Sequence, residues 1–431
     1  MFGTSGIRGG LDEVSPHLCL RLGKAVGSLS SRVVVGRDGR LTGESLKNSL
    51  VAGLESVRAE VVDVGVVPTH TVAWAAREHE SMGVMVTASH NPPGDNGVKV
   101  FDSDGTEISR ETERRLEKRV GDSDVAEPRD WTESDERGCL SAYLRDALDY
   151  VGEDGDIDLR VAVDCANGVG SLTTLPLLRE MGCEVTGVNA QIDGSFPGRE
   201  PKPTPDSVSE FGDFVRDGDF DLGLAHDGDA DRVVVVDGDG DVVPEDAVVA
   251  VLADDYTNRD GGTVVTTPNA SSKIDQRVDG EVRRTRLGGL SEAVDDDVVF
   301  AAEPWKHVFP KFGGWIDGTV SAAEVVRLVA EAGGTNALFG DIRIAVEKTN
   351  VDCPDDAKRQ AIEGVKERTR EEFGSEAEID TSYGVRLDFG GGDWALVRPS
   401  GTEPVVRVYS EGFELERVVE VVEEAIREAR T

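Results

Sequence analysis

The sequence predicts an α/β protein made of three similar mixed α/β units and a smaller α+β unit at the C-terminal end. Two observations lead to this prediction. Short apolar runs that end in glycine-rich or acidic loops alternate with helical patterns over most of the chain, and this rhythm changes after Gly340. A chain of 431 residues is also long enough for about three or four domains.

The first unit begins the alternation. Its β-branched runs predict strands, and apolar positions at helical spacing predict a helix between two of them. The predicted strands are Ser31–Val35, Glu60–Val67 and Gly83–Val86, and the predicted helix is Ser45–Val57. The third strand leads directly into the polar loop Thr87–Gly97.

The rhythm then restarts twice, which predicts a second and a third unit of the same kind. In the second unit we expect strands at Leu159–Val163, Cys183–Val188, Asp219–Ala225 and Val233–Val236, with a helix at Leu172–Met181. In the third unit we expect helices at Ala247–Tyr256 and Ser321–Ala332, with strands at Gly262–Thr267 and Val298–Ala301.

The last unit has a different order of elements. We expect helices at about Asp356–Phe373 and Leu415–Ala429, and strands around Val385–Phe389, Trp394–Val397 and Val405–Ser410. The acidic stretch Asp122–Arg137 and the segment Thr349–Asp355 are the predicted linkers.

The composition excludes some classes of partner. There are 84 acidic residues against 46 lysines and arginines, a net charge of −38, so we expect no nucleic-acid partner. An excess of solvated carboxylates with few lysines is typical of proteins from a high-salt cytoplasm, because molar salt shortens the screening length to about 3 Å. We therefore hypothesise a halophilic source, with an ordinary acidic protein as the alternative.

The sequence also predicts a cytoplasmic protein without a membrane span. No apolar run approaches the length of about 18 residues that a spanning helix needs, and the N-terminal residues lack a signal-peptide pattern. The five cysteines are scattered, form no CxxC pair and are interpreted as reduced thiols. We expect a monomer or a homodimer.

The loop Thr87–Gly94 is the first candidate for chemistry. Ser89 is followed by His90 on a segment constrained by proline and glycine, and a serine nucleophile needs a base and nearby positive charge. His90, Lys99 and Arg8 are candidates for those roles. A Ser/Asn turn without chemistry explains the same residues equally well.

A second candidate is the acidic loop between two predicted strands. Asp227, Asp229 and Asp231 alternate with small residues, and converging carboxylate oxygens suit a hard divalent cation. An EF-hand is excluded because Arg232 and Gly238 occupy its glycine and glutamate positions. A solvated acidic turn is the alternative, and it is the favoured interpretation of the similar stretch Asp237–Asp241.

Two further loops carry cations. The segment Arg398–Arg407 holds two arginines, two hydroxyl groups and a glycine, a suitable cradle for phosphate, with a charged hairpin as the alternative. The segment Glu303–His307 follows a strand and could line a sugar pocket or pack its tryptophan. Asp164–Gly170 fails the dinucleotide-binding fingerprint at Thr173, and no serine lies in a G-x-S-x-G elbow.

Taken in order, these loops resemble the α-D-phosphohexomutase superfamily, which includes phosphoglucomutase, phosphomannomutase and phosphoglucosamine mutase. The resemblance covers nearly the whole chain. It rests on the segments Phe2–Gly9, Val35–Asp38, Thr87–Pro92, Val163–Gly168, Asp193–Pro197, Asp227–Arg232 and Arg398–Pro404.

The resemblance implies four domains around a central cleft. We expect a phosphoserine domain at 1–138, a metal-binding domain at 139–243, a sugar-binding domain at 244–342 and a C-terminal phosphate-binding domain at 343–431. It further implies that Ser89 is carried as phosphoserine and binds one Mg²⁺ together with Asp227, Asp229 and Asp231.

The remaining site residues are implied in the same way. Around the transferred phosphoryl group we expect Arg8, His90, Lys99 and Arg232. Sugar contacts are expected from Glu303 and His307. The distal phosphate is expected to bind Arg398, Ser400, Gly401, Thr402 and Arg407.

The implied reaction interconverts hexose 1-phosphate and 6-phosphate through a hexose 1,6-bisphosphate, which also acts as activator. The sugar would be glucosamine, glucose or mannose, and Lys99 or His307 would act as general acid or base. The family usually has Glu-x-Ser-Gly-His in the sugar loop, whereas Trp305 and Lys306 stand here in place of the serine and glycine. Indole stacking on the sugar or a changed sugar preference would follow.

Two alternatives remain open at this point. The altered sugar loop is compatible with a non-catalytic relative that binds sugar phosphate. A haloacid-dehalogenase-like phosphatase would instead use Asp237 and Asp239 after the strand Val233–Val236. That second alternative leaves the cations of Arg398–Arg407 without a role.

Overall fold

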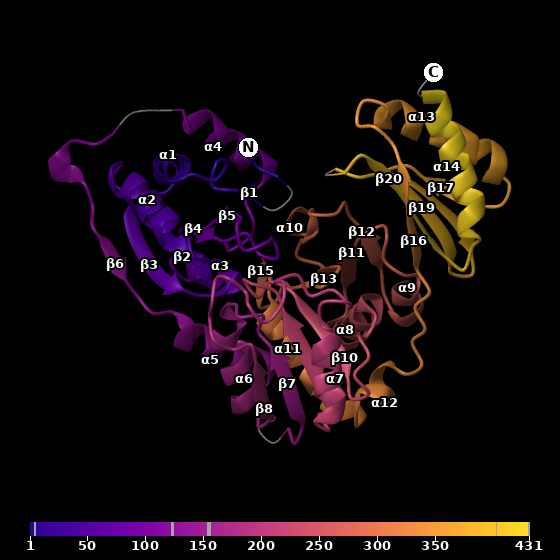
Figure 1. Ribbon diagram of the computed structural model, residues 1–431, viewed down its shortest axis with the longest axis horizontal. Coiled ribbons are helices and arrows are strands. Elements are labelled where there is room, and N and C mark those ends of the chain that lie inside the picture. Colours follow the sequence, from indigo (N-terminus) through magenta and orange to yellow (C-terminus); the bar gives the residue numbers. More distant parts are fainter. Residues whose placement is uncertain (4–5, 122–124, 153–156, 402, 430–431) are drawn as a thin grey trace.

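The computed structural model describes residues 1–3, 6–121, 125–152, 157–401 and 403–429 (Figure 1). Within these residues the strands form four separate sheets that follow one another along the chain. The first three sheets are mixed, and the fourth is antiparallel throughout. The predicted α/β class, with three similar mixed units and a smaller α+β unit, is confirmed.

The first unit has a sheet in the order β1-β5-β4-β2-β3-β6 with helices on its faces. Its strands are β1 (Ile7–Gly9), β2 (Arg32–Arg37), β3 (Glu60–Val66), β4 (Met82–Val86), β5 (Asn96–Phe101) and β6 (Ser134–Glu136). Its helices are α1 (Pro16–Gly27), α2 (Gly43–Glu55), α3 (Thr69–Glu78), α4 (Arg110–Arg119) and the 3₁₀ turn η1 (Pro128–Asp130). Helices α1 and α2 pack closely because Gly23 and Gly53 each face a backbone carbonyl of the other helix, where a Cβ would collide at 2.1 Å.

The second unit has a four-stranded sheet in the order β10-β9-β7-β8. Its strands are β7 (Arg160–Asp164), β8 (Glu184–Val188), β9 (Leu222–His226) and β10 (Val233–Asp237). Its helices are α5 (Leu140–Val151), η2 (Val169–Leu172), α6 (Thr174–Glu180) and α7 (Ser209–Asp217). Strands β9 and β10 are antiparallel neighbours, so the loop that joins them turns back at one edge of the sheet.

The third unit has a five-stranded sheet in the order β12-β11-β13-β14-β15. Its strands are β11 (Thr263–Thr266), β12 (Val282–Arg284), β13 (Val298–Glu303), β14 (Lys306–Phe309) and β15 (Gly313–Ile316). Its helices are α8 (Glu245–Asp260), α9 (Lys273–Arg277), α10 (Leu290–Ala293), α11 (Gly318–Ala332) and α12 (Thr335–Phe339).

The fourth unit is an antiparallel sheet in the order β16-β20-β19-β18-β17, covered by two helices. Its strands are β16 (Glu347–Asp352), β17 (Glu378–Asp380), β18 (Val385–Gly390), β19 (Asp393–Pro399) and β20 (Val405–Glu411). Its helices are α13 (Lys358–Phe373) and α14 (Leu415–Ala429), whose apolar faces cover the sheet.

The distribution of buried apolar side chains separates the fourth unit from the rest. One continuous cluster extends from Val34 to Phe339 and joins the first three units. The fourth unit has a cluster of its own, which extends from Cys353 to Ile426. Figure 1 shows this unit standing apart, connected through the segment that leads into β16.

Most predicted elements are present with ends shifted by a few residues, and one predicted linker is wrong. The segment Thr349–Asp355 was expected to connect two units, but most of it belongs to β16. Every side chain of β16 is exposed or only partly buried, so its sequence lacks the apolar alternation that marks a strand. The other predicted linker, Asp122–Arg137, contains the fully exposed edge strand β6, and residues 122–124 lie outside the described part of the chain.

Among the described residues, no helix is both long enough and apolar enough to cross a membrane.

Candidate active site

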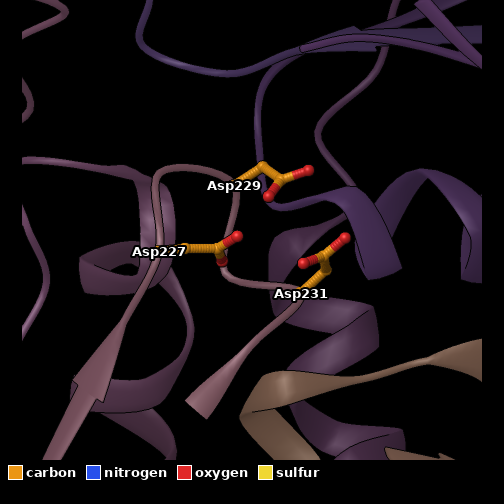
Figure 2. Close-up of side chains that lie close together, drawn as sticks. All are labelled: Asp227, Asp229 and Asp231. Atoms are coloured by element: carbon orange, nitrogen blue, oxygen red, sulfur yellow. The ribbon is translucent and has the colours of Figure 1, made fainter. Parts of the chain in front are cut away.

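Three carboxylates meet on the loop between β9 and β10. Asp227, Asp229 and Asp231 are almost completely buried, and each offers one oxygen within 4.8 Å of the oxygens of the other two (Figure 2). The alternating spacing brings the side chains together because the loop folds back on itself at Ala230, whose φ is +58°. The interpretation as a solvated acidic turn is therefore wrong.

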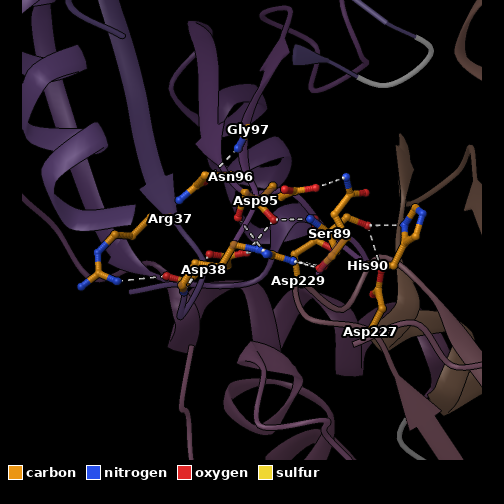
Figure 3. A network of polar contacts seen from close by, with 12 residues as sticks. Arg37, Asp38, Ser89, His90, Asp95, Asn96, Gly97, Asp227 and Asp229 are labelled. Atoms are coloured by element: carbon orange, nitrogen blue, oxygen red, sulfur yellow. Dashed lines mark hydrogen bonds and ion pairs between the residues drawn. The ribbon is translucent and has the colours of Figure 1, made fainter. Parts of the chain in front are cut away.

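Ser89 lies directly against this trio, although it is 138 residues away from Asp227 in the sequence. Its Oγ donates a hydrogen bond of 2.8 Å to Asp227 and lies 3.4 Å from Asp231 Oδ1 and 3.3 Å from His90 Nδ1 (Figure 3). The serine follows the carboxyl end of β4, has a left-handed backbone with φ of +53° and is inaccessible to solvent. The predicted serine is thus brought into contact with two of the three predicted metal ligands.

Lys99 provides the nearest positive charge. It projects from β5, and its Nζ donates hydrogen bonds of 2.7 Å to Asp229 and 2.6 Å to Asp231. Burial lowers the pKa of Lys99, but these two carboxylates outweigh it and hold the pKa above its ordinary value. Lys99 is therefore an ammonium group that balances part of the charge of the trio.

The third carboxylate, Asp227, has no cation as close as Lys99, since its nearest ion-pair partner is Arg232 at 3.8 Å. Burial, together with the negative charges of Asp231 and Asp229, raises the pKa of Asp227 well above its ordinary value. In Asp231, burial acts in the same direction, but Lys99, Lys306 and Arg232 hold its pKa well below the ordinary range.

The donor set fits a hard divalent cation. Asp229 Oδ1 is buried and has no hydrogen-bond partner within the described residues, and Asp227 has no ammonium group beside it. Oxygen ligands of this kind are those that Mg²⁺ or Ca²⁺ takes in proteins. The trio, with a phosphate on Ser89, would complete such a ligand set.

His90 is neutral at physiological pH. Burial, followed by the positive charges of Arg232 and Arg8, lowers the pKa of His90 to about 2. The imidazole can therefore accept a hydrogen bond at this site, and it contributes no positive charge to it.

The predicted arginines converge on a cavity of about 720 Å³ whose lining comes from all four units. Arg8, Arg232, Arg398 and Arg407 all line it, and within the described residues each has a buried Nε without a hydrogen-bond partner. A buried guanidinium N–H without an acceptor is suited to an anion, since it remains available to an oxygen. Other nitrogens of these groups are already engaged, because Arg398 donates to the Tyr409 hydroxyl and Arg407 to the Glu403 carboxylate. Lys306 lines the same cavity, whereas Lys99 lies behind it against the trio.

The altered sugar loop is divided between the cavity and the protein interior. Glu303, at the end of β13, lines the cavity and accepts a hydrogen bond from the Gly288 amide. Lys306 is 4% exposed, with its Nζ 3.9 Å from Asp231 and 3.8 Å from Glu303. Lys306 therefore connects the loop of Glu303 with the loop that carries the Asp trio.

Trp305 and His307 have other surroundings. Part of the Trp305 side chain lines the cavity, and its apolar face packs on the cluster around Val208, Phe211 and Val234 in the second unit. His307 is buried, its ring nitrogens contact Ser321 and Glu245, and it is not among the lining residues. The structure thus does not bring His307 to the cavity where a sugar contact was predicted.

The C-terminal loop is also only partly directed to the cavity. Ser400 is buried and accepts a hydrogen bond from the Glu403 amide, and its carbonyl accepts one from Lys358. Ser400 and Gly401 do not line the cavity, whereas Arg398 and Arg407 do. Thr402 lies outside the described residues.

Sequence reasoning missed several residues of the site. Lys202, Lys348 and Tyr409 line the cavity, and the Thr69 hydroxyl donates a hydrogen bond to Asp229. Each stands alone in its segment, without a neighbouring motif that marks it. The scarcity of lysine in so acidic a chain was the one available signal for Lys202 and Lys348.

The stretch Asp237–Asp241 is a turn, as predicted. The Asp237 carboxylate accepts hydrogen bonds from the amides of Asp239 and Asp241, and Gly240 has a φ of +86°. Its carboxylate is thereby engaged in the turn itself, which gives no support to the phosphatase alternative.

Comparisons with known proteins agree with this geometry. The phosphoglucomutase/phosphomannomutase family matches the chain with its alpha/beta/alpha domain I at residues 1–126, its alpha/beta/alpha domain II at 141–240 and its C-terminal domain at 349–428. The chain therefore belongs to this family, within the α-D-phosphohexomutase superfamily, and the predicted class of enzyme, a sugar-phosphate mutase, is confirmed.

Individual relatives are similar over almost their whole length. A phosphopentomutase of Thermococcus kodakarensis is 42% identical, covering 95% of this chain and 93% of its own. A probable phosphoglucosamine mutase of Methanopyrus kandleri is also 42% identical, covering 99% and 96%. A phosphoglucomutase/phosphomannomutase family protein of Burkholderia thailandensis has a solved structure with a TM-score of 0.86 at 25% identity, covering 100% and 98%.

Proposed function

We propose that this protein interconverts sugar 1-phosphates and 6-phosphates of the hexose class through a phosphorylated Ser89. The observation that carries this proposal is the position of the Ser89 hydroxyl, which is in contact with Asp227 and directly precedes His90 and Asn91, two residues that line the arginine-rich cavity. A nucleophile, a metal-ligand set and two separate groups of phosphate-binding cations are the parts that such a mutase needs.

Mg²⁺ is the proposed cofactor, one ion per chain, held by Asp227, Asp229, Asp231 and the phosphate on Ser89. When bound, the ion supplies positive charge to the phosphoryl oxygens. An N-acetylphosphoglucosamine mutase of Aspergillus fumigatus, which shares this fold at 16% identity with a TM-score of 0.64, was solved in complex with GlcNAc-6P and magnesium.

The side chains of this chain carry the remaining roles. Arg8 and Arg232 bind the equatorial oxygens of the phosphoryl group that leaves Ser89, and a sugar hydroxyl attacks in line with the Ser89 oxygen. Arg398 and Arg407 hold the phosphate at the other end of the sugar. The resulting 1,6-bisphosphate turns around within the cleft, so that its second phosphoryl group returns to Ser89.

Lys99 is the proposed proton carrier. It shares Asp231 with Ser89. The transfer moves one proton, because Lys99 gives its proton to the serine oxygen as the phosphoryl group leaves and takes the proton of the attacking sugar hydroxyl in its place. His307 was the other candidate. Its ring is bound on both nitrogens and lies away from the cavity, so we do not assign it this role.

Each of the four proposed domains contributes one part of the site. We propose that residues 1–138 carry the phosphoserine, 139–243 the metal ligands, 244–342 the sugar loop and 343–431 the distal phosphate site. The five cysteines are buried and free, which is compatible with a reducing cytoplasm. The expected monomer or homodimer stays a prediction.

A pentose phosphate is the second candidate substrate. A relative with 42% identity over 95% of this chain is named phosphopentomutase. In this chain Trp305 and Lys306 also add bulk where the family has serine and glycine, which favours a smaller sugar.

Turnover of the Ser89→Ala variant tests the function. We expect the wild type, with Mg²⁺ and molar KCl, to isomerise at least one of the glucose, mannose, glucosamine and ribose 1-phosphates when the matching bisphosphate is present. Ser89→Ala should lose this activity. Ser81→Ala is the matched control, because Ser81 is also buried just before β4 and its hydroxyl has no hydrogen-bond partner within the described residues. Undiminished turnover of Ser89→Ala would exclude Ser89 as the nucleophile, and absence of turnover in the wild type would favour a binding protein.

A further inference from the structure

Arg40 is a cation enclosed by the loop that carries Ser89. It is 1% exposed, and its guanidinium group donates five hydrogen bonds, which is the full capacity of an arginine. The acceptors are the carboxylate of Asp38 and the backbone carbonyls of Ser89, Asn91, Pro92 and Asp95, at distances of 2.7 to 3.2 Å. Four backbone carbonyls of one loop therefore converge on one planar group.

Both sides of the Ser89 backbone are held by this network. The Ser89 carbonyl accepts from Arg40 at 2.8 Å, and the Ser89 amide donates to Thr87 Oγ1 at 2.8 Å. The Thr87 hydroxyl in turn donates to the same Asp38 carboxylate that binds Arg40. A serine in the left-handed region, with φ of +53°, is strained and keeps that conformation only where its surroundings fix it.

The same arginine also contacts the second unit. Its guanidinium carbon lies 5.1 Å from the centre of the Phe196 ring. The loop around Gly194 approaches so closely that a Cβ there would lie 2.4 Å from the Gly39 carbonyl. Phe196 also contacts the loop of the Asp trio at Gly228. A Cβ on Gly228 would lie 3.1 Å from the Phe196 ring and 2.8 Å from the Ser89 carbonyl.

We propose that Arg40 is a positioning residue for phosphoryl transfer: it fixes the loop of Ser89 and docks it, through Phe196, at the distance from the Asp trio that transfer requires. This inference rests on the proposed function of Ser89. It gives a common role to the segments Val35–Asp38 and Asp193–Pro197, which lie outside the cavity that binds substrate.

The variants Arg40→Met and Arg40→Lys test this role. Loss of the five hydrogen bonds should let Ser89 move relative to the trio, and a displacement of about 1 Å lowers kcat roughly 100-fold while KM changes little. Lysine should not rescue, because an ammonium group lacks the planar fork that reaches four carbonyls. Added guanidinium ion at low concentration should restore part of the activity of Arg40→Ala, whereas ammonium ion should not.

Two readouts separate this role from general stability. Hydrogen exchange of residues 87–97 should become faster in the Arg40 variants, and phosphorylation of Ser89 by the bisphosphate should slow in parallel with kcat. The control is Arg327→Met, which removes another buried arginine that binds Glu324 and Asp255 in the third unit. It should lower thermal stability and leave kcat unchanged.

The possible outcomes are distinct. If the wild type turns over and a folded Arg40→Met keeps its kcat and its slow exchange at 87–97, the inference is overturned while the function stands. If the wild type is neither phosphorylated nor active, the proposed function fails first. If the Arg40 variants do not fold, Thr87→Val removes the acceptor of the Ser89 amide in a milder way, and an unchanged kcat in that variant contradicts the inference.

Discussion

Asp246 shows at the scale of one residue how the excess of acid affects this molecule. It lies in the first turn of α8 and accepts a hydrogen bond from the Ser271 amide. Burial, followed by the charges of Glu245 and Glu411, raises the pKa of Asp246 to about 7. The folded state therefore holds this proton more tightly than the unfolded chain does, and the stability that it contributes is lost as the pH rises from about 4 through 7.

Replacement of Asp246 by asparagine should remove this pH dependence, because the amide still accepts the hydrogen bond and carries no charge. We expect Asp246→Asn to gain stability relative to the wild type between about pH 5 and pH 8, by an amount on the order of 2 kcal/mol. Calorimetric Tm values at both pH values in molar KCl measure it. Asp296→Asn, at an exposed position, is the control. An equal Tm difference at both pH values would contradict the assignment.

Residues that lie together in a short segment could be predicted from the sequence, and isolated residues could not. Asp227, Asp229 and Asp231 share one loop, and Ser89 lies in a recognisable motif. The role of Arg40 was not predicted, because its partners are backbone carbonyls about fifty residues away, which no side-chain pattern reveals. His307 was assigned to the sugar from its motif, but β14 turns its ring toward Ser321 and Glu245.

At the scale of the elements, helix α11 is the clearest case of a helix held by long-range contacts. Its N-cap Asp317 is buried and accepts from the amides of Thr319 and Val320. The same carboxylate accepts from the Tyr143 hydroxyl in the second unit and from the Trp315 indole. One cap thus stabilises both a helix end and an interface between units.

Loss of this cap should cost more than loss of an ordinary one. Asp317→Ala leaves several buried donors without an acceptor, so we expect a loss on the order of 3 kcal/mol. Ser109→Ala removes the cap of the exposed helix α4, where a loss of about 1 kcal/mol is typical. Thermal unfolding of both variants measures the difference. Equal losses would mean that the contact with Tyr143 contributes nothing.

Elements with strong periodicity were predictable and exposed ones were not. The helices α8, α11 and α14 were expected from their apolar positions. Strand β16 was mistaken for a linker because its pairing with β20 uses backbone groups and buries no side chain fully. The sequence around Ser15-Pro16 carries a helix-start signal, a serine cap followed by proline, that would have revealed α1.

At the scale of the whole molecule, the chain is strongly acidic, but basic side chains gather around one cavity. Arg8, Arg232, Lys306, Arg398 and Arg407 come from all four units and line one cavity in a chain of net charge −38. Their presence in motifs could be predicted. Their convergence depends on the arrangement of four sheets, which local patterns do not determine.

The charge of the whole molecule predicts a dependence on salt. We expect the Tm to rise continuously from dilute buffer to molar KCl, because screening removes the repulsion between surface carboxylates. Sucrose is the control for preferential exclusion without screening, and it should raise the Tm much less. Full stability in dilute buffer would contradict a halophilic source.

Transfer of a phosphoryl group to Ser89 is the most direct test of the proposed mechanism. The purified protein, incubated with a sugar 1,6-bisphosphate and Mg²⁺, should gain the mass of one phosphoryl group, and peptide mapping should place it on Ser89. Addition of the matching sugar monophosphate should remove it and form bisphosphate. A protein that gains no phosphoryl group, or gains it equally in Ser89→Ala, would contradict the mechanism.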